Sequence, residues 1–279
     1  LNPPQEPQIA ATNSTAPATD AQRTPIGGRA NIVDRNGIIL AASLPTVSLY
    51  ANPRDILDAR ESAAKLLQVL PDLDRGRLHD RLTGKGALAW IKRNLPPKQQ
   101  YEINRLGLPG IHFRRASLRV YPHGTEASHI LGLTDVDNRG IAGIEKTFDE
   151  QLKSGSQPLT LSIDIRVQSI LHAEIGQAMT EFRASGAAGI VLDVANGEIL
   201  AMTSLPSFDP NTPETASPDA IFNRATKGVY EMGSTFKLFT TAMALDSGVV
   251  RLTDGYDASK PIHIGRFTIR DFHGKNRWL

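Results

Sequence analysis

The sequence predicts an α+β protein in which two domains follow an N-terminal linker. Its 279 residues are about the length of two ordinary domains. Two Asn-Gly pairs, at 36–37 and 196–197, each separate two short apolar runs, which is typical of a tight β-hairpin. Other segments carry apolar residues at helical spacing. This mixture of short strands and helices predicts an α+β fold.

The first 27 residues are rich in Pro, Ala, Thr, Asn and Gln and have few large apolar side chains. Such a segment cannot bury enough surface to offset the entropy cost of ordering it, so we expect residues 1–27 to be a disordered linker. The chain starts with Leu rather than Met, and it ends at Leu279 within sequence that reads as ordered. We therefore expect a piece of a longer protein, truncated at both ends. No apolar run of about 18 residues, the length needed for a membrane span, is present.

The first domain is expected to span residues 28–156. It opens with the hairpin whose turn contains Gly37 and closes near Gly155. Short apolar runs between turn residues predict strands, and apolar residues three and four apart predict helices. The predicted strands are 30–33, 38–41, 46–51, 87–95 and 111–121, and the predicted helices are 55–70, 74–82 and 97–106.

The second domain is expected to span residues 157–279. Asp164 is placed to cap a helix, on which apolar residues from Val167 to Phe182 form one stripe. Gly248 is expected to end the last helix. The predicted elements are a strand at 159–163, the capped helix, a hairpin with strands at 188–193 and 198–202, a loop at 206–219 and a helix at 234–247.

Composition excludes several classes of site. The 31 basic and 29 acidic side chains give a net charge of +2. This is not the large excess of positive charge that is typical of nucleic-acid-binding proteins, so we expect no nucleic-acid partner. The absence of cysteine excludes thiol nucleophiles, Cys-ligated zinc and disulfides. The seven histidines show no metal-binding spacing, and we expect neither a metal nor a cofactor. We expect structural hydrogen bonds or ion pairs instead from His123, His129, Arg119 and Glu145.

The segment with the strongest chemical signal is Ser234-Thr-Phe-Lys237. A hydroxyl at position i and an amine at i+3 lie on one face of a helix. A serine becomes a good nucleophile when a base removes its proton, and a lysine can be that base if burial or a neighbouring cation keeps it neutral. The start of a helix also offers free N–H groups to a developing oxyanion. The alternative is a serine that only caps the helix beside a solvated lysine.

A second copy of the Ser-x-x-Lys spacing, Ser62-Ala-Ala-Lys65, lies inside the predicted helix 55–70. No glycine or loop precedes it. We expect both of its side chains to face solvent and to have no chemical role.

The segment Glu231–Lys237 resembles the active-site segment of penicillin-binding proteins. Further segments resemble class B members of that family, in the expected order. They are Gly28-Arg-Ala-Asn-Ile-Val-Asp-Arg-Asn-Gly37, Arg119-Val-Tyr-Pro-His-Gly124, His129-Ile-Leu-Gly132, Gly140-Ile-Ala-Gly-Ile-Glu145 and Asp193-Val-Ala-Asn-Gly-Glu-Ile-Leu-Ala-Met202. The residues from 223 to 247 and the ending Ile269-Arg-Asp-Phe-His-Gly-Lys are similar to the cell-division type. The resemblance covers about 28–279.

The resemblance implies a pedestal (dimerisation-type) domain at 28–156. It also implies that 157–279 is the first half of a penicillin-binding, serine β-lactamase-like transpeptidase domain. Ser234 would attack the D-Ala-D-Ala bond of a peptidoglycan stem peptide, with Lys237 as base, and β-lactams would acylate the same serine. The implied partners are stem peptides, β-lactams and division-machinery membrane proteins, including a septal glycosyltransferase. The implied location is the periplasmic face of the inner membrane, with an N-terminal anchor helix outside this chain.

The chain departs from the family pattern in two ways. Arg29-Ala replaces the usual Arg-Gly, which is a small change. The chain also has no Lys-Thr-Gly, and no Ser-x-Asn follows Lys237; by family order both belong beyond Leu279. We therefore expect these residues alone to be inactive. Two alternatives remain: a non-catalytic interaction protein of the division machinery, and a β-lactamase or β-lactam sensor, against which the pedestal-like segment argues.

Overall fold

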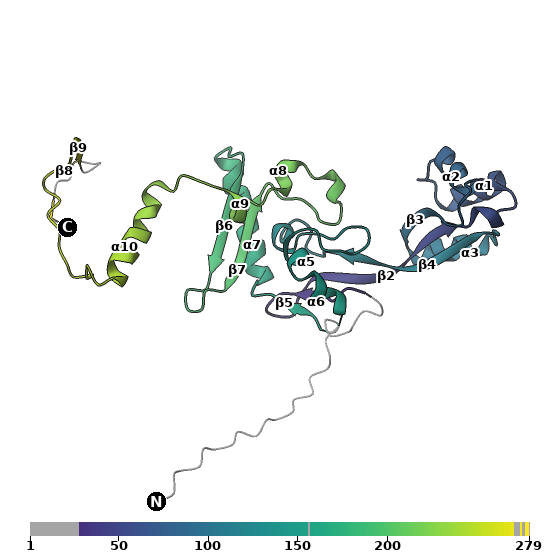
Figure 1. Cartoon of the computed structure of the whole chain (residues 1–279), viewed down its shortest axis with the longest axis horizontal. Helices are drawn as coiled ribbons and strands as arrows, with labels where there is room; N and C mark the ends of the chain where they lie inside the picture. Colours follow the sequence, from purple (N-terminus) through teal and green to yellow (C-terminus); the bar gives the residue numbers. More distant parts are fainter. Residues whose placement is uncertain (1–27, 156, 271–273, 275–276, 279) are drawn as a thin grey trace, which may run out of the picture. The chain divides into compact units, whose positions relative to one another are not determined.

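The computed structural model describes residues 28–155, 157–270, 274 and 277–278 and divides the chain into two compact units, Leu1–Gly228 and Val229–Leu279 (Figure 1). The linker predicted at 1–27 lies outside the described residues. None of the described helices is both long and apolar enough to cross a membrane. Mixed helices and strands agree with the α+β prediction.

The first unit is organised by a five-stranded sheet. Its strand order is β3-β2-β1-β5, and β4 pairs with β2 (Figure 1). The strands are β1 (Ile32–Val33), β2 (Ile39–Ala51), β3 (Ala89–Leu95), β4 (Ile111–Val120) and β5 (Leu159–Thr160). The β1–β2 hairpin is confirmed, with Gly37 at φ +83° in its turn.

The separate strand predicted at 46–51 is wrong, because β2 runs unbroken through 13 residues. The partner strand explains the difference. β4 pairs with β2 from Ala42 opposite Val120 to Ala51 opposite Ile111, so a continuous antiparallel ladder holds Pro45 within the strand. One long strand therefore serves two hydrophobic cores.

The first core lies in what we call the head, which consists of β3, the adjoining parts of β2 and β4, and three helices (Figure 1). The helices are α1 (Ala59–Val69), α2 (Arg75–Leu82) and α3 (Pro97–Arg105). Leu49, Leu66, Leu82 and Ile103 are fully or almost fully buried there. Helix α1 is shorter than predicted because the Asp58 carboxylate caps it, while Pro53–Asp55 forms a separate 3₁₀ turn.

The second core lies in the base, where β1, β5 and the other ends of β2 and β4 meet three short helices that the sequence did not predict. They are α4 (Ser128–Leu131), α5 (Gly143–Thr147) and α6 (Asp149–Ser154). Glu145 is fully buried in the base. Its carboxylate accepts hydrogen bonds from Arg29 and, at 2.7 Å, from Arg119 Nε, and Arg29 also pairs with Asp149. The expected structural ion pair of Arg119 and Glu145 is confirmed.

The strand β5 is shorter than predicted because the chain leaves the edge of β1 and turns towards β7 (Ile199–Leu205). The Leu161 amide still donates to Val33, whereas the Asp164 amide donates to Leu200 O at 2.9 Å. Asp164 then caps α7 (Ile165–Glu181), as predicted, by accepting a hydrogen bond from the Arg166 amide.

Helix α7 packs on a hairpin of β6 (Ala187–Leu192) and β7, and this hairpin is confirmed. Only part of the predicted apolar stripe is covered. Leu171 and Ile175 lie against β6 at Gly189, whereas Phe182 remains 76% exposed. The predicted loop 206–219 contains a 3₁₀ turn, but it ends earlier than predicted because α8 (Pro218–Ile221) already begins at Pro218. A second short helix, α9 (Arg224–Lys227), follows.

Three polar side chains join the base to this hairpin and its loop. Gln168 is fully buried and bonds to Glu126 O, Met202 N and Met202 O. The amide of Asn211 accepts from Tyr121 N at 2.9 Å and donates to Tyr121 O at 3.0 Å. His129 Nε2 lies 2.8 Å from Ala220 O. His129 therefore does make a structural hydrogen bond, with a partner beyond residue 156.

We expect Glu145→Gln to lower the free energy of unfolding by about 3–5 kcal/mol, because the buried Arg119 guanidinium loses its carboxylate partner and the buried Arg29 keeps only Asp149. Urea unfolding of residues 1–279 measures this change. Glu150→Gln is the matched control. Its side chain is 92% exposed, so we expect a change of only about 0.5 kcal/mol. Equal effects of the two substitutions would contradict a supporting role for Glu145.

Burial is the main cause that lowers the pKa of His129, and the neighbouring Arg224 and His172 lower it further. The unfolded state therefore binds a proton more readily, so stability should fall as the pH drops below about 6.5 towards the lowered folded pKa. We expect His129→Gln to reduce the loss of unfolding free energy between about pH 7.5 and about pH 5.5. His79→Gln, on α2 of the head, is the matched histidine substitution outside this junction. A loss unchanged by His129→Gln would reject this linkage.

Candidate active site

The Ser-x-x-Lys segment lies in the second unit, in a 3₁₀ turn at Gly233–Phe236 that leads into α10 (Lys237–Asp246). The α-helix therefore begins three residues later than predicted. Its end is as predicted, with Gly248 at φ +69° after the last turn. The unit also contains a hairpin of β8 (Ile262–Ile264) and β9 (Phe267–Ile269).

The structure places Lys237 Nζ 3.0 Å from Ser234 Oγ, and the amine donates a hydrogen bond to the hydroxyl. The 3₁₀ turn explains this proximity. With three residues per turn, side chains at i and i+3 of a 3₁₀ helix eclipse each other, so the two groups lie along one edge. The late start of the α-helix thus favours the contact on which the proposed chemistry depends.

Gly233 comes immediately before the serine with φ +52°, a conformation that L side chains rarely adopt. A Cβ atom at this position would meet no described atom within 4 Å beyond its chain neighbours, so the space beside Gly233 is open. Both Ser234 and Lys237 are exposed, and no described carboxylate pairs with the lysine. A proton can move along the Oγ–Nζ line, which is the geometry that general-base activation of a serine requires.

The surface of α10 is apolar and open. Leu238, Phe239 and Met243 are each more than half exposed, and the tilted rings of Phe236 and Phe239 have their centroids 5.7 Å apart. Helices with apolar residues around much of their circumference are usually buried in folded proteins. The serine therefore lies next to a helix whose composition suits a protein core.

The second Ser-x-x-Lys copy has a different geometry. Ser62 is buried, with 4% of its surface exposed, so the expectation that it faces solvent is wrong. It lies on the face of α1 that packs into the head core, beside Ala63. Lys65 is partly exposed, as expected, but its amine pairs with Glu61 at 2.7 Å rather than with the serine. Only the copy at 234–237 joins hydroxyl and amine.

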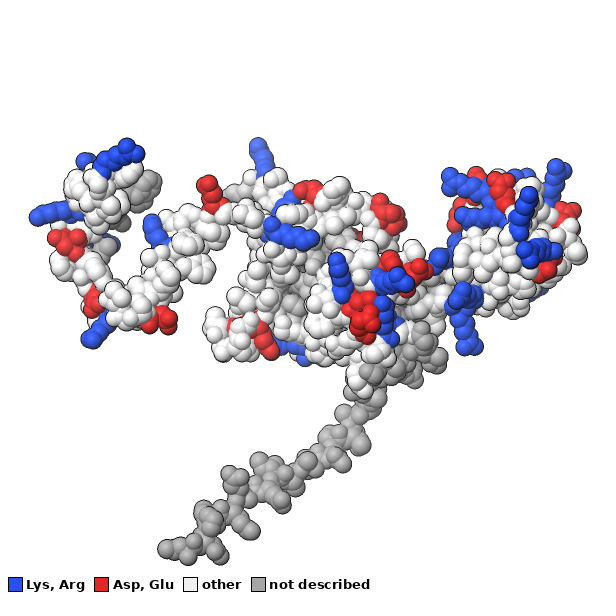
Figure 2. Space-filling view, in the orientation of Figure 1, with Lys and Arg blue, Asp and Glu red and all other residues white. Residues whose placement is uncertain are grey.

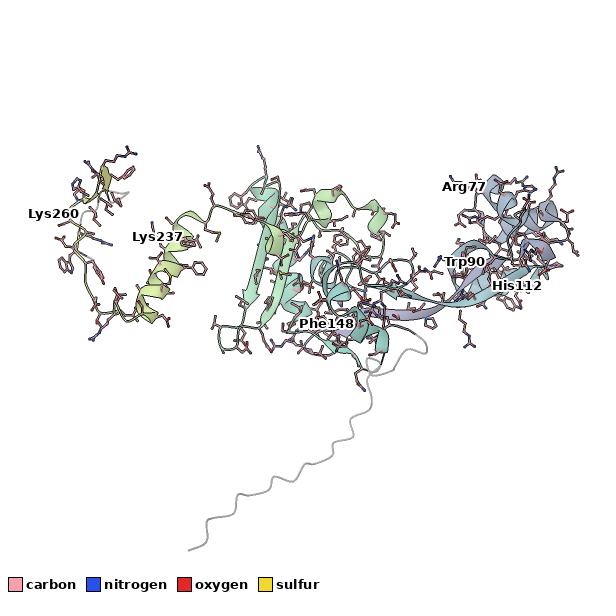
Figure 3. All side chains as sticks on the ribbon, viewed as in Figure 1. Arg77, Trp90, His112, Phe148, Lys237 and Lys260 are labelled. Carbon is pink, nitrogen blue, oxygen red and sulfur yellow. The ribbon has the colours of Figure 1, made fainter. Side chains whose placement is uncertain are left out.

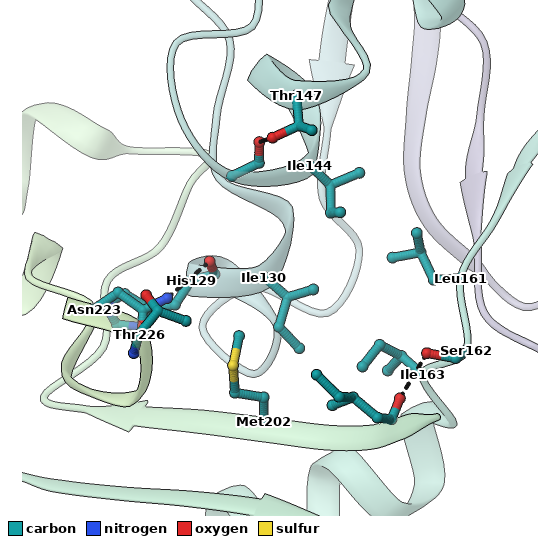
Figure 4. A pocket seen from close by; sticks show the side chains of 12 residues that line it. His129, Ile130, Ile144, Thr147, Leu161, Ser162, Ile163, Met202, Asn223 and Thr226 are labelled. Atoms are coloured by element: carbon teal, nitrogen blue, oxygen red, sulfur yellow. Dashed lines mark hydrogen bonds between the residues drawn. The ribbon is translucent and has the colours of Figure 1, made fainter. Parts of the chain in front are cut away.

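An apolar pocket of about 340 Å³ lies elsewhere, in the first unit, between α4, α5 and β7 (Figure 4). Figure 4 shows Ile130, Ile144 and Met202 around it, with Ser162 bonded at its edge to the Ile199 carbonyl. The elements that line the pocket are those that join the base to the hairpin, so the pocket is part of that junction. Within the described part of the chain, no three His, Asp or Glu residues are grouped to hold a metal ion.

Sequence reasoning missed the residues that hold the base to the hairpin, Gln168 and Asn211. Their partners are 34 to 90 positions away, and no local pattern distinguishes them from solvated amides. A glutamine at the fourth position of an amphipathic helix is expected at the surface, but Gln168 is fully buried, so the sequence carried no signal for its role.

Two family models match the chain. Residues 26–161 match the penicillin-binding protein dimerisation domain, and residues 187–277 match the penicillin binding protein transpeptidase domain. A peptidoglycan synthetase from Bifidobacterium adolescentis has a similar fold, with a TM-score of 0.59 and 23% identity over 88% of this chain and 54% of that one.

Curated relatives of the chain are named as peptidoglycan D,D-transpeptidases. The chain is 41% identical to a probable peptidoglycan D,D-transpeptidase FtsI of Caulobacter vibrioides, over 88% of this chain and 42% of the relative. It is 33% identical to the peptidoglycan D,D-transpeptidase FtsI of Escherichia coli, over 80% of this chain and 43% of the relative. The chain thus spans less than half the length of these two relatives. Its two matched domains and these identities show that it belongs to the class B penicillin-binding proteins of the FtsI type.

Proposed function

We propose that this chain is part of a peptidoglycan D,D-transpeptidase that cross-links stem peptides at the division septum through a serine acyl-enzyme. The observation that carries the proposal is the 3.0 Å contact between Ser234 Oγ and Lys237 Nζ. The names of the FtsI relatives and the match to the transpeptidase domain support it. Within the chain we propose a pedestal domain at 28–156 and the first part of the transpeptidase domain at 157–279.

In the proposed mechanism the neutral Lys237 amine accepts the proton of Ser234. The serine oxygen attacks the carbonyl carbon between the two terminal D-alanines, and the amide C–N bond breaks. The leaving D-alanine takes the proton from Lys237, and a serine ester remains. An amine of a second stem peptide then attacks this ester, forms the new amide and returns the proton to the serine. A β-lactam would enter the first step and leave a long-lived ester.

The exposed surroundings of the serine indicate that more of the protein takes part. Electrostatic stabilisation of an oxyanion and a neutral lysine both depend on a site that excludes water. Because Ser234 and Lys237 are exposed, we propose that residues 1–279 alone are not competent for catalysis. We further propose partners among division-machinery membrane proteins, including a septal glycosyltransferase. The proposed location is the periplasmic face of the inner membrane, with an N-terminal anchor outside this chain.

Labelling with a fluorescent penicillin tests the nucleophile. In the full-length protein we expect Ser234→Ala to abolish covalent labelling, because the substitution removes the only oxygen that can form the ester. Ser62→Ala is the matched control from the second Ser-x-x-Lys copy and should label like the unchanged protein. A full-length protein that never labels yet still binds division proteins would reject the enzyme and favour a scaffold.

The acylation rate tests the base. We expect Lys237→Gln to slow acylation of the full-length protein by about 10²–10⁴-fold, the usual contribution of a general base. Lys65→Gln, which breaks only the exposed pair with Glu61, should leave the rate unchanged. Stopped-flow mixing with the fluorescent penicillin measures both rates. If Lys237→Gln acylated at the original rate, another group would have to be the base.

A further inference from the structure

The head is strongly basic. Residues 52–117 contain thirteen Lys and Arg against seven Asp and Glu, although the whole chain has a net charge of only +2. Figure 2 shows many Lys and Arg side chains over this lobe. Such a local excess attracts anionic partners over distances of about one Debye length, roughly 8–10 Å at physiological ionic strength.

The sheet of the head has one face that its helices do not cover. Leu49, Ile91 and Leu95 face the helices and are buried. On the other face Tyr50 pairs with Trp90 on β3 and with His112 on β4. The Tyr50 ring lies 5.9 Å from Trp90 and 5.4 Å from His112. Figure 3 shows Trp90 and His112 beside these strands.

Two arginines, Arg93 and Arg114, lie against the aromatic rings of this face. The guanidinium groups of Arg93 and Arg114 lie over the Trp90 ring, at 5.1 Å and 6.0 Å from its centroid. Together with Arg115 they line a pocket of about 240 Å³. Its opposite wall is the turn around Asp137, where the Asp135 carboxylate accepts hydrogen bonds from the Asp137 and Arg139 amides. The pocket is thus preformed by a sheet and a hydrogen-bonded turn.

The charges in this pocket are not balanced. Arg93 pairs with Asp137 at 3.2 Å. Arg114 and Arg115 are exposed, and neither makes an ion pair with any residue that the structure describes. The hydroxyl oxygen of Ser117, also in the pocket lining, has no hydrogen-bond partner there. Strand alternation places Arg114 on the Tyr50 face of β4 and Arg115 on the opposite face, so the two residues flank the pocket. Their exposed guanidinium groups are free to pair with carboxylates of a partner.

We propose that the Trp90–Arg93–Arg114–Arg115 pocket is a docking site for an acidic segment of a partner protein, whose Asp or Glu side chains pair with Arg114 and Arg115. Guanidinium groups bind carboxylates through two parallel hydrogen bonds, and Trp, Tyr and Arg are the residues that dominate binding energy at protein interfaces. Pockets for small organic ligands usually measure about 300–1,000 Å³. A volume of 240 Å³ suits one or two side chains of a larger partner instead.

A decaglutamate peptide carrying a fluorescent dye is the probe. In residues 1–279 with Trp278→Phe, Trp90 is the only tryptophan, so its emission reports occupancy of this pocket directly. We expect a saturable rise in peptide anisotropy together with a saturable change in Trp90 emission. The double variant Arg114→Gln/Arg115→Gln should raise the Kd by about tenfold or more, because it removes both unpaired guanidinium groups.

The matched control is Arg75→Gln/Arg77→Gln on α2, which removes the same charge from exposed positions of the head. Its Kd should change by no more than about twofold. A decaglutamine peptide should not bind. Urea unfolding of both double variants verifies that the head is folded.

Three results would overturn the proposal. Equal weakening by the two double variants would show diffuse charge attraction without a site. Failure of the peptide to saturate, or to change Trp90 emission, would remove the pocket as a ligand site. Phosphatidylglycerol vesicles that change Trp90 emission when the peptide does not would indicate a lipid surface instead of a protein partner.

Discussion

The buried carboxylate of Glu145 is the interaction on which the first unit depends. It joins Arg29, at the start of the described chain, to Arg119, at the end of β4, although these residues are 90 positions apart. Without it Arg119 would be a buried cation with no carboxylate partner and Arg29 would keep only Asp149, which is destabilising because desolvation of a charge costs several kcal/mol. The base therefore closes only when three distant segments meet. The long strand β2 then carries that anchored end into the head.

The base in turn holds the β6–β7 hairpin and the loop after it, because side-chain amides pair with backbone groups. Asn211 offers Tyr121 one acceptor and one donor, as a neighbouring strand would, and Gln168 does the same for Met202. Buried backbone groups must be paired, so these amides determine how the loop after β7 runs. The loop and hairpin are held by specific polar contacts around a small apolar pocket, in addition to α7 packing on the strands.

The contact between Ser234 and Lys237 is different, because local geometry alone produces it. A 3₁₀ turn eclipses Ser234 and Lys237, and no distant residue is needed to bring them together. What local geometry cannot provide is a dry environment. The apolar residues of α10 are exposed here, and the reactivity we propose needs surroundings that cover them.

The sequence by itself determined the elements whose signals are local. The two Asn-Gly hairpins, the Asp164 cap, the Gly248 stop and the Ser-x-x-Lys pair all depend on residues within a few positions of one another. Only the tertiary structure decided that 46–51 continues β2, that Ser62 is buried, and that His129 reaches Ala220. Strand continuity depends on a partner strand, and burial depends on what packs above a helix. Neither is encoded in spacing along the chain, because the segments that meet are tens of residues apart.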